Sequence, residues 1–132
     1  ANKKMTIINI QPKKFTGFKR MLWATFYSYK GLHSALRHEV AFRQEFIAFV
    51  LLLPVVFWID FTAIERFILI ASMIAVMVVE LINSAIESTL DRVSLEHHLL
   101  TGRAKDYGSL AVLLTLIISI TAWTLLLWHR FF

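Results

Sequence analysis

Polar residues that could do chemistry recur at helical spacing inside an otherwise apolar stretch: Glu80, Asn83, Ser84, Glu87 and Asp91. In an α-helix each residue turns the chain by about 100°, so positions i, i+3, i+4, i+7 and i+11 share one face. An ionisable group at membrane depth costs about 2.5–3.5 kcal/mol on insertion scales and usually marks a functional site. We therefore predict a functional face, called the carboxylate stripe below, that consists of these five residues.

The composition indicates an integral membrane protein. Of the 132 residues 58% are hydrophobic, compared with about 45–50% apolar residues in soluble domains, and the excess is concentrated in blocks. The net charge is +5. Beside three apolar blocks, anionic lipid headgroups explain this basic excess better than nucleic acid does, so no nucleic-acid partner is expected. Cysteine is absent, which excludes disulfides and thiolate metal sites.

The hydropathy pattern predicts an all-α membrane protein with an amphipathic surface helix and three transmembrane helices. The expected elements are a basic N-terminal arm at 1–16, the surface helix at 17–37, spans at 39–59, 64–93 and 107–130, and a polar loop at 94–106. Aromatic and basic residues together suit a helix in the interface plane. The charge-free part of the first span is short for a crossing of roughly 20 residues. Glu39, Arg43 and Glu45 should therefore face protein or headgroups.

The placement of lysine and arginine predicts the orientation in the membrane. Nine of them lie in the N-terminal segment and three near the second loop, whereas only Arg66 and Arg130 fall on the other side. By the positive-inside rule, the N-terminus and the loop at 94–106 are cytoplasmic. The stripe then reaches the face where nucleotides are. Trp58, Trp123 and Trp128 are expected to lie in the interfacial belt.

The residues at the cytoplasmic face suit a divalent cation bound together with phosphate groups. Mg²⁺ prefers one or two carboxylates plus phosphate oxygens and water, a role that Glu39 and Glu87 fit. Lys105 could neutralise phosphates. Glu80 lies about 10 Å deeper than Glu87, where it could serve as a general base toward a lipid hydroxyl. Phosphoryl transfer needs little beyond such positioning and charge neutralisation. The sequence has no glycine-rich phosphate loop of the usual kinds.

Three segments resemble the small integral-membrane diacylglycerol kinases of bacteria: EVAFRQE at 39–45, VELINSAIESTLDR at 79–92 and GRAKDYGS at 102–109. The resemblance extends from Phe15 to about Trp128. It implies a homotrimer whose active sites are shared between neighbouring protomers. The implied reaction transfers phosphate from MgATP to diacylglycerol, gives ADP and phosphatidic acid, and takes place at the inner membrane of a Gram-negative cell.

The resemblance also implies roles for individual residues. Glu80 would be the catalytic base, and Glu39 and Glu87 would hold Mg²⁺. The residues around the nucleotide would be Arg20, Tyr27, Glu39, Asn83, Glu87, Asp91, Glu96, His97, His98, Lys105 and Asp106. The residues on the lipid side would be Arg20, Ser28, Glu45, Glu80 and Ser109. Leu99 departs from the family pattern, which implies a second acidic residue there.

The sequence leaves alternatives to the lipid kinase. A related branch of the same family phosphorylates undecaprenol. A proton or cation transporter could use Glu80 as a relay, but it would want a second deep acid, and the third span has none. A membrane assembly protein would not need the carboxylates. Glu80 could also be a structural polar group, and Asn83 and Ser84 could join helices.

Overall fold

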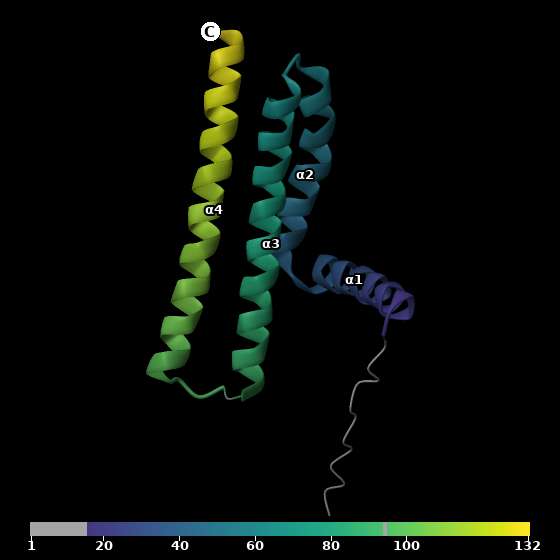
Figure 1. Cartoon of the computed structure of the whole chain (residues 1–132). Coiled ribbons are helices and arrows are strands. Elements are labelled where there is room, and N and C mark those ends of the chain that lie inside the picture. Colours follow the sequence, from purple (N-terminus) through teal and green to yellow (C-terminus); the bar gives the residue numbers. More distant parts are fainter. Residues whose placement is uncertain (1–15, 94) are drawn as a thin grey trace, which may run out of the picture. The chain divides into compact units, whose positions relative to one another are not determined.

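The computed structural model describes residues 16–93 and 95–132, which form four helices (Figure 1). They are α1 (Phe18–His38), α2 (Val40–Trp58), α3 (Ala63–Val93) and α4 (Leu99–Phe131). Every described element is helical, which confirms the predicted all-α class. The helices α2, α3 and α4 are each long and apolar enough to cross a membrane, so the three predicted spans are confirmed. The predicted arm at 1–16 lies outside the described residues, apart from its last residue.

The chain divides into two compact units, one up to His33 and one from Ser34 onward, and each is described by itself. In the first unit, α1 carries a cluster of aromatic rings on its own surface. Trp23 meets Phe26 edge to face at 5.7 Å between ring centroids, and Lys30 Nζ lies 5.7 Å from the centre of the Phe26 ring. Exposed aromatic residues with basic neighbours are typical of interfacial helices.

The break between α1 and α2 falls at Glu39, whose extended backbone places it at the N-cap of α2. The last carbonyls of α1 find a partner in the next helix. Arg43 Nη1 donates to the carbonyls of Leu36 at 3.2 Å and Arg37 at 3.5 Å. This side chain therefore satisfies backbone groups that a helix end leaves open, and it keeps Glu39 at the joint.

A capping box starts α3. The Thr62 N–H donates to Glu65 Oε2 at 2.7 Å, and the Glu65 N–H donates to Thr62 Oγ1 at 3.2 Å, so the two residues satisfy each other's amides. The turn before them is tied to the end of α4, because Arg130 Nη2 pairs with Asp60 Oδ2 at 2.6 Å. Figure 1 shows the α2–α3 turn and the C-terminus at the same end of the bundle.

The start of α4 differs from the prediction of a loop over 94–106. The helix begins at Leu99, because the His98 side chain accepts a hydrogen bond from the Leu100 N–H at 3.1 Å and caps it. Gly102 and the charged residues after it are consequently helical. Residues 99–106 therefore belong to the same helix as the third span instead of forming a loop.

The helix α3 forms the centre of the three-helix unit, where it packs against both α2 and α4 (Figure 1). Its core cluster consists of Val56, Phe61, Leu69 and Met73. A buried hydrogen bond of 3.1 Å between Ser72 Oγ and Ser119 Oγ joins α3 to α4. Hydroxyl pairs of this kind commonly join transmembrane helices.

The prediction for Trp123 is wrong, because this residue packs against the core cluster and its Nε1 is buried. Apolar residues occupy all faces of α4, so hydropathy alone does not show which face, and hence whether Trp123, packs against the core. Trp58 and Trp128 are 88% and 65% exposed, as belt residues should be.

Candidate active site

The carboxylate stripe runs from the interior of the three-helix unit to its surface. Glu80, Asn83 and Ser84 are 7%, 8% and 7% exposed, Glu87 is half-buried and Asp91 is exposed. The exposure of the stripe rises along α3 because the unbroken helix extends beyond the core, so the same face is buried at Glu80 and exposed at Asp91. Burial of a carboxylate and an amide requires partners, so the contacts of the stripe decide what it can do.

Glu39 joins the stripe from α2. Ser84 Oγ donates a hydrogen bond of 3.2 Å to Glu39 Oε2, and this contact crosses from α3 to the α2 N-cap. On the adjacent position of α3, Asn83 Nδ2 donates to Glu87 Oε1 at 3.5 Å. The two carboxylates that were predicted to hold Mg²⁺ are thus bonded to consecutive residues of one helix. Their negative charges would repel each other, and a bound cation would relieve that repulsion.

A second polar group lies where α3 ends and α4 begins. Lys105 Nζ pairs with Asp91 Oδ1 at 3.0 Å and so bridges the two helices. Both residues line a cavity of about 340 Å³ whose other polar side chains are Glu96, His97, His98 and Thr101. The first turn of α4 opens there. The N-terminus of a helix carries free amides and partial positive charge, which suit phosphate.

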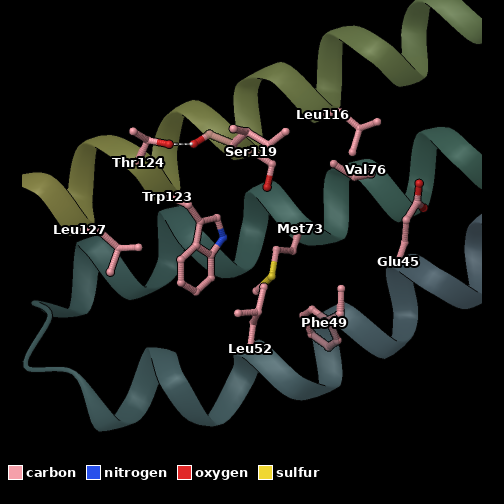
Figure 2. Close-up of a pocket in the computed structure, with 12 residues that line it drawn as sticks. Glu45, Phe49, Leu52, Met73, Val76, Leu116, Ser119, Trp123, Thr124 and Leu127 are labelled. Atoms are coloured by element: carbon pink, nitrogen blue, oxygen red, sulfur yellow. Dashed lines mark hydrogen bonds between the residues drawn. The ribbon is translucent and has the colours of Figure 1, made fainter.

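Glu45 lies deeper, on α2, at one end of an apolar cavity between the three helices (Figure 2). Its side chain is half-buried, and its Oε2 is buried and makes no hydrogen bond to any residue that the structure describes. A buried acceptor of this kind is costly unless a ligand supplies the donor. A donor from outside the described residues would satisfy Glu45 Oε2.

Comparison with known proteins identifies the family. Residues 26–127 match the family described as prokaryotic diacylglycerol kinase. The chain belongs to this family. A diacylglycerol kinase of Escherichia coli K12 is 49% identical over 116 residues, which cover 88% of this chain and 95% of that protein. A diacylglycerol kinase of Pseudomonas aeruginosa is 47% identical over 112 residues, covering 85% and 91%. The relative from Haemophilus influenzae, of the same name, is 43% identical over 110 residues, covering 83% and 93%.

Five further residues that the family resemblance implies have no described contact with the stripe or either cavity. Asp106 and Ser109 are exposed on α4 and line neither cavity. Arg20, Tyr27 and Ser28 belong to the first unit, where all three are exposed. The roles of these five residues stay predictions.

Sequence reasoning missed Gly108, which lies buried on α4 against Asn83. A Cβ built on Gly108 would overlap Asn83 Oδ1, so no side chain fits there. Small residues at crossing points of transmembrane helices allow close approach of backbones. A glycine in an otherwise apolar span was the available sequence indication, but its partner helix and register were not visible. In this diacylglycerol kinase family member the glycine permits the Asn83 position.

Proposed function

We propose that this chain is an ATP-dependent diacylglycerol kinase. It transfers the γ-phosphoryl group of ATP to the hydroxyl of diacylglycerol and produces phosphatidic acid and ADP. The observation that carries the proposal is the burial of Glu80 on the face of α3 whose next turns carry Ser84, which binds Glu39 of the α2 N-cap, and then Glu87 and Asp91. The buried carboxylate would then lie within the bilayer, beneath the groups that would bind the nucleotide. The relatives named above are all diacylglycerol kinases, so undecaprenol is not favoured as the acceptor.

Glu80 acts as the general base in this proposal. Its carboxylate accepts the proton of the lipid hydroxyl while the hydroxyl oxygen forms a bond to the γ-phosphorus. The bond from that phosphorus to the bridging oxygen breaks, and ADP leaves. The protein forms no covalent bond to the phosphoryl group in this step. Its contribution to the rate comes mainly from positioning the reactants and neutralising the phosphate charge.

Glu39 and Glu87 would hold Mg²⁺. Two carboxylates fixed by Ser84 and Asn83 match the ligand set that Mg²⁺ uses, in which phosphate oxygens and water supply the remaining positions. Within the residues described, no three acidic or histidine side chains form a closed protein cage for a metal, and such a cage is not what Mg²⁺ requires. When bound, the cation neutralises phosphate charge.

The nucleotide would lie at the cavity between the end of α3 and the start of α4. Lys105 supplies positive charge toward phosphates, and the amides of the first α4 turn donate to them. Asp91 holds Lys105 in place. Glu96, His97 and His98 line the same cavity and would contribute further contacts. Asp106, Arg20 and Tyr27 are assigned to the nucleotide by the family resemblance alone.

On the lipid side, Glu45 would accept a hydrogen bond from the glycerol backbone, since its buried Oε2 accepts none from the described residues. Ser28, Ser109 and Arg20 would complete the approach of the headgroup. These assignments follow from the family resemblance together with the position of Glu45 at the apolar cavity.

The orientation follows from the substrate. ATP is cytoplasmic, so the end of the bundle with Asp91 and Lys105 faces the cytoplasm, as the lysine and arginine distribution also predicts. The N-terminus is then cytoplasmic and the membrane is the bacterial inner membrane. We also propose a homotrimer with active sites shared between protomers, on the strength of the resemblance. Chemical cross-linking in detergent should give a trimer as the largest discrete product.

The test uses purified full-length chain in mixed micelles with radiolabelled ATP and, side by side, diacylglycerol and undecaprenol. We expect phosphatidic acid to form and undecaprenyl phosphate to form far more slowly. Glu80→Gln should abolish transfer while the oligomer persists. Glu65→Gln is the matched control, because it changes a carboxylate on the same helix and keeps a side chain able to form the capping box. Unchanged turnover in Glu80→Gln would remove the base from the mechanism.

A further inference from the structure

Glu39 is the single residue between α1 and α2, and its backbone is bonded to both helices. Its N–H donates to the Ala35 carbonyl at 2.9 Å and closes α1, and its carbonyl accepts from the Arg43 N–H at 3.0 Å and opens α2. The backbone of Glu39 is extended, with φ −105° and ψ 106°, so the chain changes direction there. The direction of the Glu39 carboxylate therefore depends on the geometry of this joint.

The Glu39 carboxylate uses neither of the two partners that its place in the chain offers. An N-cap side chain can accept hydrogen bonds from the first amides of the helix it starts, but that of Glu39 accepts none. A glutamate four residues before an arginine commonly pairs with it on a helix. Within the described residues, however, Glu39 and Arg43 form no ion pair. The carboxylate instead accepts a hydrogen bond of 3.2 Å from Ser84 on α3.

The Arg43 guanidinium is directed at the end of α1. Its Nη1 donates to the carbonyls of Leu36 at 3.2 Å and of Arg37 at 3.5 Å. Both are among the last four carbonyls of α1, which no amide of the same helix can reach. The side chain thus connects the last turn of α1 to the first turn of α2, on either side of Glu39. Because its Nη1 is held by two oxygen atoms of α1, Arg43 leaves the Glu39 carboxylate to other partners.

We propose that Arg43 is a positioning residue for the cation site. By connecting the two helix ends at the joint, it keeps the Glu39 carboxylate directed at the carboxylate stripe, where Mg²⁺ would bind between Glu39 and Glu87. This inference rests on the proposed function, since the two glutamates hold Mg²⁺ only there. Mg²⁺ requires near-ideal octahedral geometry at short distances, so a small change in the direction of one carboxylate weakens its binding.

Two explanations of Arg43 predict opposite effects of its removal on cation binding. If the guanidinium acted only through its positive charge, it would repel Mg²⁺ and weaken its attraction to Glu39. Removal of that charge would then tighten the binding of the cation. If Arg43 positions Glu39, its removal leaves two carbonyls of α1 without a donor and loosens the joint. Binding of the cation then becomes weaker, so the direction of the change distinguishes the two explanations.

The experiment measures the binding of Mn²⁺, as a substitute for Mg²⁺, to the purified full-length chain in a neutral detergent with a non-hydrolysable ATP analogue. The signal is the enhancement of water proton relaxation, which rises when Mn²⁺ joins the slowly tumbling protein. Arg43→Met should raise the dissociation constant by about tenfold, the lower end of the loss for a group that orients a metal ligand. Arg37→Met is the matched control, because it removes an exposed positive charge at the same joint and keeps the carbonyl that Arg43 binds.

The same variants are assayed for phosphatidic acid formation over a range of Mg²⁺ concentrations. Arg43→Met should need about tenfold more Mg²⁺ for half-maximal activity, with kcat at saturating Mg²⁺ close to that of the wild type. This result, with weaker Mn²⁺ binding and Arg37→Met like the wild type, supports the proposal. Unchanged or tighter Mn²⁺ binding in Arg43→Met overturns it, and so does an equal loss in Arg37→Met.

Arg43→Gln covers the case in which Arg43→Met fails to fold, because glutamine loses the charge but retains an N–H donor on a shorter side chain. A raised dissociation constant in this variant supports the proposal, and an unchanged or lowered one overturns it. A wild-type chain that phosphorylates diacylglycerol while the Arg43 variants bind Mn²⁺ normally overturns this inference alone. A wild-type chain that binds no Mn²⁺ and forms no phosphatidic acid overturns the proposed function, and this inference with it.

Discussion

Gly108 on α4 lies against the side chain of Asn83 on α3 so closely that no Cβ could be accommodated between them. Asn83 is 8% exposed, and its Nδ2 donates to Glu87 Oε1. The missing side chain of Gly108 therefore leaves room for the Asn83 amide, and that amide donates a hydrogen bond to a carboxylate proposed to bind Mg²⁺. The backbone of α4 thus contributes to the geometry of a site formed by α2 and α3.

Gly108→Ala should damage both packing and catalysis. Forcing a methyl group into a filled interface costs about 1–3 kcal/mol of unfolding free energy, and a displaced catalytic contact can lower kcat by about 10²-fold. Thermal unfolding in detergent and initial rates of phosphatidic acid formation measure the two effects. Gly102→Ala is the stability control, because a Cβ there meets no atom within 4 Å. Equal stability of the two variants would contradict the close packing.

Removal of the Ser84 hydroxyl should weaken binding of MgATP. A hydrogen bond to a charged group contributes about 1.5–3 kcal/mol, so Ser84→Ala should raise the KM for MgATP by about tenfold or more if Glu39 loses its orientation. The measurement is the dependence of rate on MgATP at saturating lipid. Thr89→Ala serves for comparison, because the Thr89 hydroxyl donates to the Ala85 carbonyl of its own helix at 2.8 Å. A KM like that of the wild type would exclude this contact from the site.

Lys105→Met should act on nucleotide binding far more than on stability. Exposed ion pairs contribute about 0–1 kcal/mol to folding, and the side chains of Lys105 and Asp91 are 42% and 53% exposed. The KM for ATP should rise severalfold while the unfolding temperature stays nearly unchanged. Arg130→Met breaks another exposed pair, at the opposite end of the bundle. That variant should leave the KM for ATP unaltered, and a similar rise in both variants would indicate a nonspecific effect of lost charge.

Glu87→Gln should raise the Mg²⁺ concentration that gives half-maximal activity, because an amide oxygen is a weaker ligand for a hard cation than a carboxylate. A magnesium titration at fixed ATP tests this. Glu65→Gln, on the same helix but in the α3 capping box, should titrate like the wild type. A normal magnesium dependence in Glu87→Gln would remove this residue from the metal site.

The carboxylate stripe could be predicted from sequence because a helical period acts on residues of one element, and an unbroken α3 preserves it. The start of α4 could not be predicted from sequence, because it depends on the His98 cap. In the sequence His98 looks like an ordinary loop residue, and only the structure shows its contact with the Leu100 amide. The orientation of Trp123 was missed for another reason. Apolar residues occupy every face of α4, so its sequence does not indicate which side faces the core.

The capping box at Thr62 and Glu65 has a consequence beyond the turn it stabilises. Because α3 runs without interruption from there to Val93, the first turn of the helix sets the rotational phase of every later residue. One inserted residue anywhere between the box and Glu80 would swing the acidic side chains by about 100° and aim them at another sector of the bundle. Homologues can therefore vary in the length of their connections and tails, whereas the spacing from this outer turn to the reactive carboxylate is fixed by the pitch of a single helix.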